Sequence, residues 1–210
     1  MIDRTSAGHA LRAQHLEAWG EDYNPPGSLI LPEERWLLCE QARNSPPGCI
    51  VEVGVYWGGS AYNLIDTAKL QDRQIWLYDT FEGMMDSDPD KGDAIPLGDI
   101  KADEAKVRES LGLYPHIVKC AFPYTDQLPP APVAFAHIDC DQYHSILETC
   151  RALDPLMAKG GAIWFNDTPT LEGARRAVRD FYMPGADHLT FDDACRIKYD
   201  HDSGQWFVRY

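Results

Sequence analysis

The chain of 210 residues carries a formal net charge of −14, and 44% of its residues are hydrophobic. This length and apolar content suit one globular domain with a full core. The negative charge repels phosphate backbones, which argues against nucleic acid as a partner and favours a small or neutral substrate. No apolar segment approaches the ~18 residues that a membrane span needs, and no positively charged start leads into an apolar run. We therefore expect a cytoplasmic protein.

The N-terminal part has helical spacing interrupted by one loop. Residues 11–19 and 32–42 are helical in period, and the prolines and glycines of residues 20–28 predict a loop between them. We expect residues 1–47 to form an N-terminal helical cap on a single domain that spans residues 1–210.

From residue 49 onward, short apolar runs alternate with segments of helical spacing. The apolar runs predict strands at residues 49–56, 74–79, 116–122, 133–139 and 161–167. The other segments predict helices at residues 60–70, 102–113, 145–157 and 171–183. Continuous apolar strands that alternate with helices indicate a parallel sheet covered on both faces, which is a doubly wound α/β fold.

Two segments depart from this rhythm. Residues 194–210 predict two strands joined around Asp202, Ser203 and Gly204, so we expect the last strand to be antiparallel to its neighbour. Residues 83–101 are polar, acidic and without period, and they cannot bury enough apolar surface to order themselves alone. We expect them to form a mobile lid that becomes ordered over a bound substrate.

Ligands bind to such sheets beyond the carboxyl ends of the strands. The first strand runs into a glycine-bearing turn at residues 54–60, and the second ends at Asp79. The turn lets a ligand approach the backbone, and an acidic residue in the place of Asp79 typically accepts hydrogen bonds from ribose hydroxyls. A tight turn and a cap at Asp79 are the structural alternatives.

The fourth and fifth strands end on polar residues: Asp139, followed by Asp141 and His144, and then Asn166 with Asp167. If these strands are neighbours, Asp139, Asn166 and Asp167 converge, and three oxygen ligands with room for water suit Mg²⁺. A cation would also relieve the repulsion between packed carboxylates. Asp141, one alternation beyond Asp139, is expected to point to the other side. Helix capping is the alternative role.

Five motifs carry a family resemblance in this order: VEVGVYWGGSA, LYDTFEGM, HIDCDQYHS, LDPLMAKGGAIWFNDT and GARRAVRDFY. Over residues 28–183 the chain resembles the macrocin O-methyltransferase family, metal-dependent enzymes that use S-adenosylmethionine to methylate sugar hydroxyls in antibiotic biosynthesis. The resemblance implies a class I methyltransferase fold, which is Rossmann-like: a mostly parallel seven-stranded sheet with an antiparallel last strand.

The resemblance also implies site residues. Those expected to bind S-adenosylmethionine are Ser28, Glu52, Gly54, Val55, Tyr56, Ser60, Asp79, Phe81, Ala121 and Phe122. Asp139, Asn166 and Asp167 are implied to hold the metal, and Asp139 also to act as the catalytic base. Because the family usually has Asp-Asp where this chain has Asn166-Asp167, we expect metal binding to be retained but weaker.

The expected reaction is transfer of a methyl group from a sulfonium to a hydroxyl of a small-molecule acceptor. A sugar is the leading acceptor, with a phenol or catechol as the alternative. His137 and His144 are alternative bases to Asp139, and Tyr56, Trp57 and Phe81 are candidates to pack on the cofactor.

Other functions remain open from the sequence. The D-x-D at residues 139–141 also fits a glycosyltransferase that holds a metal against a nucleotide sugar. A degenerate methyltransferase that only binds a ligand is a further alternative. The sequence does not decide between a monomer and a homo-oligomer.

Overall fold

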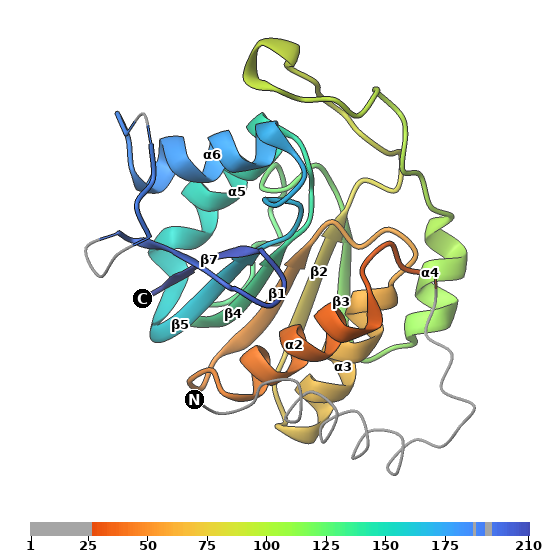
Figure 1. Cartoon of the computed structure of the whole chain (residues 1–210). Helices are drawn as coiled ribbons and strands as arrows, with labels where there is room; N and C mark the ends of the chain where they lie inside the picture. The colour runs from red at the N-terminus through yellow and green to blue at the C-terminus, as the bar shows by residue number, and fades with distance from the viewer. Residues whose placement is uncertain (1–26, 187, 192–194) are drawn as a thin grey trace.

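The computed structural model describes residues 27–186, 188–191 and 195–210 (Figure 1). Within them, one seven-stranded sheet has the strand order β3-β2-β1-β4-β5-β7-β6. The strands are β1 Cys49–Val53, β2 Ile75–Asp79, β3 His116–Lys119, β4 Val133–Ile138, β5 Met157–Phe165, β6 Ile197–Tyr199 and β7 Trp206–Arg209. Pairing from β3 to β5 is parallel, whereas β7 is antiparallel to both β5 and β6. The predicted fold class is therefore confirmed.

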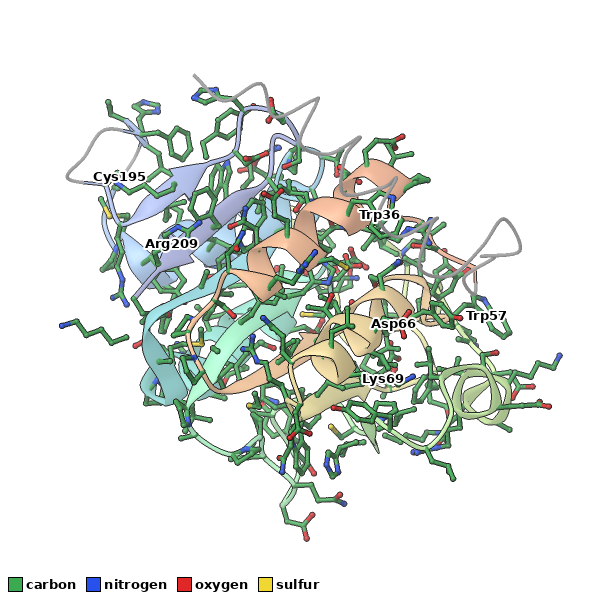
Figure 2. The ribbon with its side chains drawn as sticks, turned by 90° about the horizontal axis from the view of Figure 1, so that it is seen from below. Trp36, Trp57, Asp66, Lys69, Cys195 and Arg209 are labelled. Carbon is green, nitrogen blue, oxygen red and sulfur yellow. The ribbon has the colours of Figure 1, made fainter. Side chains whose placement is uncertain are left out.

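Helices cover both faces of the sheet (Figure 1). They are α2 Pro32–Arg43, α3 Gly59–Leu70, α4 Glu104–Leu111, α5 Tyr143–Leu153 and α6 Glu172–Tyr182, with the short 3₁₀ helices η1 Pro89–Lys91 and η2 Asp154–Leu156. Figure 2 shows α2 and α3 side by side, with Trp36 on α2 and Asp66 and Lys69 on α3. In the described residues, no helix is both long and apolar enough to span a membrane.

Each face of the sheet has its own apolar layer because side chains alternate along a strand. Ile50 of β1 and Leu77 of β2 are buried with residues of α2, α3 and α4. Val51 of β1 and Ile138 of β4 are buried on the opposite face with residues of α5 and α6. The two layers fix the sheet, so the strand ends that carry the polar residues are held in place.

Several element boundaries differ from the predicted ones. β1 ends at Val53 because Gly54 has φ +91°, a conformation that cannot continue a strand. β5 begins at Met157, which pairs with Val133, and not at residue 161 as expected. Gly160 and Gly161 interrupt the apolar run, so the sequence pattern did not include the first part of the strand. α5 begins at Tyr143 and gives way to η2, which contains Pro155.

The expected N-terminal cap is described only in part. Residues 11–19, predicted to be helical, lie outside the described residues. α2 packs on a face of the sheet through Leu38 and Ala42. Ser28 and Ile30 reach the cavity described below.

The acidic segment 83–101 projects at the top of Figure 1, between α4 and α6. Polar contacts hold it against the helices. The Asp93 carboxylate accepts the backbone N–H groups of Tyr143 and Asp88, both at 2.8 Å, and Arg176 of α6 donates to the carbonyl of Asp90 at 2.8 Å. The apolar periodicity of the sequence cannot predict such polar contacts. Movement of this segment as a lid remains a prediction.

Candidate functional site

A cavity of about 490 Å³ lies at the carboxyl ends of the parallel strands. This volume is typical of a small-molecule site. The cavity is lined by residues that follow β1, β2, β4 and β5. The strand order reverses between β1 and β4, so the cavity occupies the switch point where ligands bind in doubly wound sheets.

In the β1 and β2 half of the cavity, the Asp79 carboxylate organises the turn after β1. Its Oδ2 accepts the backbone N–H groups of Val55 at 2.6 Å and Tyr56 at 2.8 Å, and its Oδ1 accepts that of Phe81 at 2.6 Å. Asp79 thus acts as a cap for the turn, one of the roles expected from the sequence. Each oxygen has two lone pairs, so Oδ1 keeps one acceptor position for a ligand.

A glycine is required at position 54 by close contact between the two halves of the site. A Cβ atom on Gly54 would lie 1.9 Å from the backbone oxygen of Asp139. The Asp139 N–H also donates to the carbonyl of Val53 at 2.8 Å. The backbone of Asp139 is therefore fixed directly against the turn that Asp79 holds.

Most residues predicted to bind the cofactor line this one cavity. They are Ser28, Gly54, Val55, Tyr56, Ser60, Asp79, Ala121 and Phe122. Glu52 and Phe81 do not line it. Glu52 is fully buried because strand alternation turns its side chain towards the face that α2 and α3 cover, and the Phe81 side chain is buried in that same layer. The structure thus does not support cofactor contact by either side chain.

The two candidate histidines differ in position. His137 is fully buried, and its Nδ1 lies 2.8 Å from Glu52 Oε1. Burial lowers the pKa of His137, but the hydrogen bond and charge of Glu52, together with the charges of Asp139 and Asp167, raise it overall. His144 lines the cavity, with its Nε2 3.2 Å from Asp88 Oδ2. Only His144 is therefore placed to contact a substrate. Trp57 is not among the cavity-lining residues.

Three carboxylates meet at the ends of β4 and β5, where Ile138 and Phe165 are paired neighbours. One oxygen from each of Asp139, Asp141 and Asp167 lies within 4.8 Å of the others. Burial, together with the charge of Asp167, raises the pKa of Asp139 to about 8, and burial with the charge of Asp139 raises that of Asp141 well above its usual range. Three carboxylates this close cannot all ionise without a compensating positive charge.

The expectation that Asp141 points away from Asp139 is wrong. Side chains two residues apart in a strand lie on the same side, so alternation itself gives no reason for Asp141 to point away, and β4 in any case ends at Ile138. Asp141 has φ +60°, and the N–H of Gln142 donates to the carbonyl of Cys140 at 2.6 Å across it. This three-residue turn brings the Asp141 carboxylate back to the cluster.

Sequence reasoning missed Gln205, which directly precedes β7. Its side chain is 2% exposed, and its Nε2 donates to Asn166 Oδ1 at 2.5 Å. Asn166 Nδ2 in turn donates to Asp167 Oδ2 at 3.1 Å. Placing the last strand beside β5 would have pointed to Gln205, because β7 pairs with β5 as far as Phe165 and Trp206.

Beyond the cluster, the cavity is lined by Asp86, His144, Ser145 and Glu148, together with the side chains of several apolar residues. Ser145 donates to Asp86 at 3.3 Å. Over the part of the chain that the structure describes, no lysine or arginine lines the cavity.

The fold and the cavity at its switch point are those of a doubly wound ligand-binding domain, and a family match shows an S-adenosylmethionine-dependent O-methyltransferase. The model of the macrocin O-methyltransferase (TylF) family matches residues 35–189, and the chain belongs to this family. No curated protein matches the chain.

Solved structures of methyltransferases share the fold. The O-methyltransferase NovP is 24% identical, with a TM-score of 0.61 over 84% of this chain and 78% of NovP. CalS11, a calicheamicin methyltransferase, is 19% identical, with a TM-score of 0.65 over 100% of this chain and 93% of CalS11. PaMTH1 of Podospora anserina, solved with S-adenosylhomocysteine, is 14% identical, with a TM-score of 0.56 over 100% and 97% of the two chains.

Proposed function

We propose that this enzyme methylates a sugar hydroxyl of a natural product in a reaction that depends on a divalent cation, with Mg²⁺ as the leading candidate. One observation carries the proposal. The turn held by Asp79 and the cluster of Asp139, Asp141 and Asp167 line the same cavity, at the ends of neighbouring strands. A cofactor bound at the turn and a hydroxyl held at the cluster would therefore share one space.

The β1 and β2 half of the cavity is the proposed cofactor site. S-adenosylmethionine would supply the methyl group that is transferred. Asp79 has the remaining acceptor position for a ribose hydroxyl, and the backbone around Gly54 permits close approach. Tyr56 and Phe122 line the same region and present apolar ring surface to a nucleoside.

The donor set at the ends of β4 and β5 fits a hard cation. Asp139 and Asp167 present carboxylate oxygens, and the sequence resemblance adds Asn166 as the third group. Oxygen ligands of this kind suit Mg²⁺, which retains several waters. A bound cation would lower the pKa of the acceptor hydroxyl and orient its oxygen.

The proposed base is Asp139. Its side chain lines the cavity, while its backbone is fixed by the N–H bond to Val53 and by contact with Gly54. A carboxylate held in this way can accept the hydroxyl proton without reorganising. Alignment of the reacting groups would supply much of the remaining rate enhancement, an effect that can reach ~7–11 kcal/mol.

Two lines of support favour a sugar on a natural product. The family model is that of macrocin O-methyltransferase, and one CalS11 structure is titled as a calicheamicin methyltransferase. The other CalS11 structure is titled as a TDP-rhamnose 3′-O-methyltransferase, which supports a sugar acceptor but points to a nucleotide sugar. Among the described residues, the cavity offers no lysine or arginine to a diphosphate. We therefore favour a sugar already attached to an uncharged compound over a nucleotide sugar. The same argument weakens the glycosyltransferase alternative.

The test is methyl transfer from radiolabelled S-adenosylmethionine to three acceptors: a glycosylated macrolide, a nucleotide sugar and a catechol. We expect turnover with the glycosylated compound in Mg²⁺ and loss of turnover in EDTA. Turnover confined to the catechol or the nucleotide sugar would contradict the acceptor class. Cofactor binding without turnover on a broad acceptor panel would favour the degenerate, ligand-binding alternative.

A further inference from the structure

The identity of the third cation ligand is open to direct argument from the structure, and this inference rests on the proposed function. Asp139 and Asp167 belong to the donor set whichever residue completes it. The third position has two candidates, Asn166 and Asp141, which approach the cluster from different strand ends. Their hydrogen-bond partners differ in a way that decides between them.

The oxygen of Asn166 already has a strong partner. Gln205 Nε2 donates to it at 2.5 Å, and the Asn166 amide group then directs its Nδ2 to Asp167 Oδ2 at 3.1 Å. An N–H group cannot ligate a cation. In this arrangement Asn166 acts as a donor to the cluster.

The backbone around Gln205 is held in place, whereas its buried side-chain oxygen Oε1 has no hydrogen-bond partner among the described residues. The Gln205 N–H donates to Ser203 Oγ at 3.2 Å, its carbonyl accepts from Asp200 at 2.9 Å, and the next residue, Trp206, donates to Thr168 Oγ1 at 2.9 Å. Rotating the Asn166 amide alone would place its N–H group against Gln205 Nε2 and its oxygen against Asp167 Oδ2. Rotating both amides together would keep the hydrogen bond between them but would still place the Asn166 oxygen against Asp167 Oδ2. A buried group left without a partner costs roughly 1–3 kcal/mol.

Asp141 has the opposite features. Its carboxylate lies within 4.8 Å of those of Asp139 and Asp167. Its backbone has φ +60° within a three-residue turn closed by the 2.6 Å bond from Gln142 to Cys140. The Asp141 carboxylate supplies the negative charge that an aspartate, but not an asparagine, would supply at position 166.

We propose that Asp141, and not Asn166, is the third ligand of the cation, and that Gln205 is a positioning residue that keeps Asn166 turned as a donor to Asp167. The chain thereby replaces the aspartate usual in its family at position 166 with a carboxylate from the preceding strand end. The site retains three carboxylates.

Binding of Mn²⁺ to the purified protein, measured by the loss of the free-ion signal in electron paramagnetic resonance, tests the proposal without turnover. Asp141→Asn should weaken Mn²⁺ binding by about tenfold or more, because affinity follows the charge of the ligands. Asn166→Ala should change it by less than about threefold. Asp86→Asn, which removes a carboxylate from the same cavity outside the cluster, is the matched control and should resemble Asn166→Ala.

The Gln205 role is tested by Gln205→Leu in the Asp141→Asn background, with folding checked by thermal melting. Freed from Gln205, Asn166 can turn its oxygen to the cluster, so Mn²⁺ binding should strengthen. A purely structural role for Gln205 would only weaken it. Equal losses for Asp141→Asn and Asn166→Ala, or a larger loss for Asn166→Ala, would overturn the ligand assignment. Wild-type protein that binds no Mn²⁺ would contradict the cation in the proposed function instead.

Discussion

At the ends of β1 and β2, the Asp79 carboxylate accepts three backbone N–H groups, whereas at the ends of β4 and β5 three carboxylates face one another within 4.8 Å. In the first region the protein supplies the donors that a negative charge needs. In the second it supplies mostly acceptors. The charge of the first region is therefore compensated by the protein itself, and the second region is where we propose a cation. This contrast is the physical basis for assigning cofactor and cation to different halves of one cavity.

The two regions also share a feature. Each contains residues other than glycine at positive φ: Tyr56 and Phe81 near β1 and β2, and Asp141 and Asp167 near β4 and β5. Such conformations cost about 1–3 kcal/mol each and concentrate at functional sites. The strain occurs in both halves, so the difference between them lies in their charges and not in their backbone geometry.

The largest expected effect separates the halves by function. Asp139→Asn should reduce kcat by about 10²- to 10⁴-fold, the range for losing a positioned base, while S-adenosylmethionine affinity stays within about threefold. Initial rates and calorimetric titration measure the two quantities on the same sample. Normal turnover by Asp139→Asn would remove Asp139 from the chemistry.

A second prediction tests the contact between the halves. Gly54→Ala should lower the free energy of unfolding by about 1–3 kcal/mol or more, because its Cβ would overlap the Asp139 backbone oxygen and its φ is +91°. Chemical denaturation measures the loss. Gly185→Ala is the matched control for positive φ, since a Cβ at Gly185 would meet nothing within 4 Å. Equal losses for the two variants would show that the close contact adds nothing.

The next effect concerns the region at the ends of β1 and β2. Asp79→Ala should weaken S-adenosylmethionine binding by roughly 1–3 kcal/mol, the range for losing hydrogen bonds to a charged group. Part of this loss should arise from release of the turn, because Asp79 accepts the N–H groups of Val55 and Tyr56. Calorimetry gives the affinity, with Asp86→Ala as a control for loss of a cavity carboxylate. Unchanged affinity in Asp79→Ala would reduce Asp79 to a structural cap.

The smallest expected effect is local to segment 83–101. Asp93→Ala removes the acceptor for the N–H groups of Tyr143 and Asp88, so cleavage of this segment by a protease should become faster without unfolding of the domain. Cleavage should slow again when cofactor and acceptor are both bound. If neither the substitution nor the ligands alter the cleavage rate, the segment does not act as a lid.

Apolar periodicity predicted the order and type of the central elements because continuous apolar runs reflect burial on both faces. It also placed Asp79, Asp139 and Asp167 at strand ends, which is sufficient to bring them to one edge of the sheet. Asp141 was misplaced because the two-residue period was misapplied: residues 139 and 141 are two apart and therefore share a side. Apolar periodicity did not identify Gln205, which reaches Asn166 through strand pairing across 39 residues of sequence.

The most direct test of the central claim is to titrate S-adenosylmethionine and to assay methyl transfer on the same chelator-treated protein, before and after adding Mg²⁺. The account predicts that chelation abolishes transfer, that cofactor affinity changes by less than about threefold because backbone N–H groups already satisfy Asp79, and that Mg²⁺ restores the rate. Full transfer after exhaustive chelation, or loss of cofactor binding together with the metal, would contradict the division of the cavity into two halves.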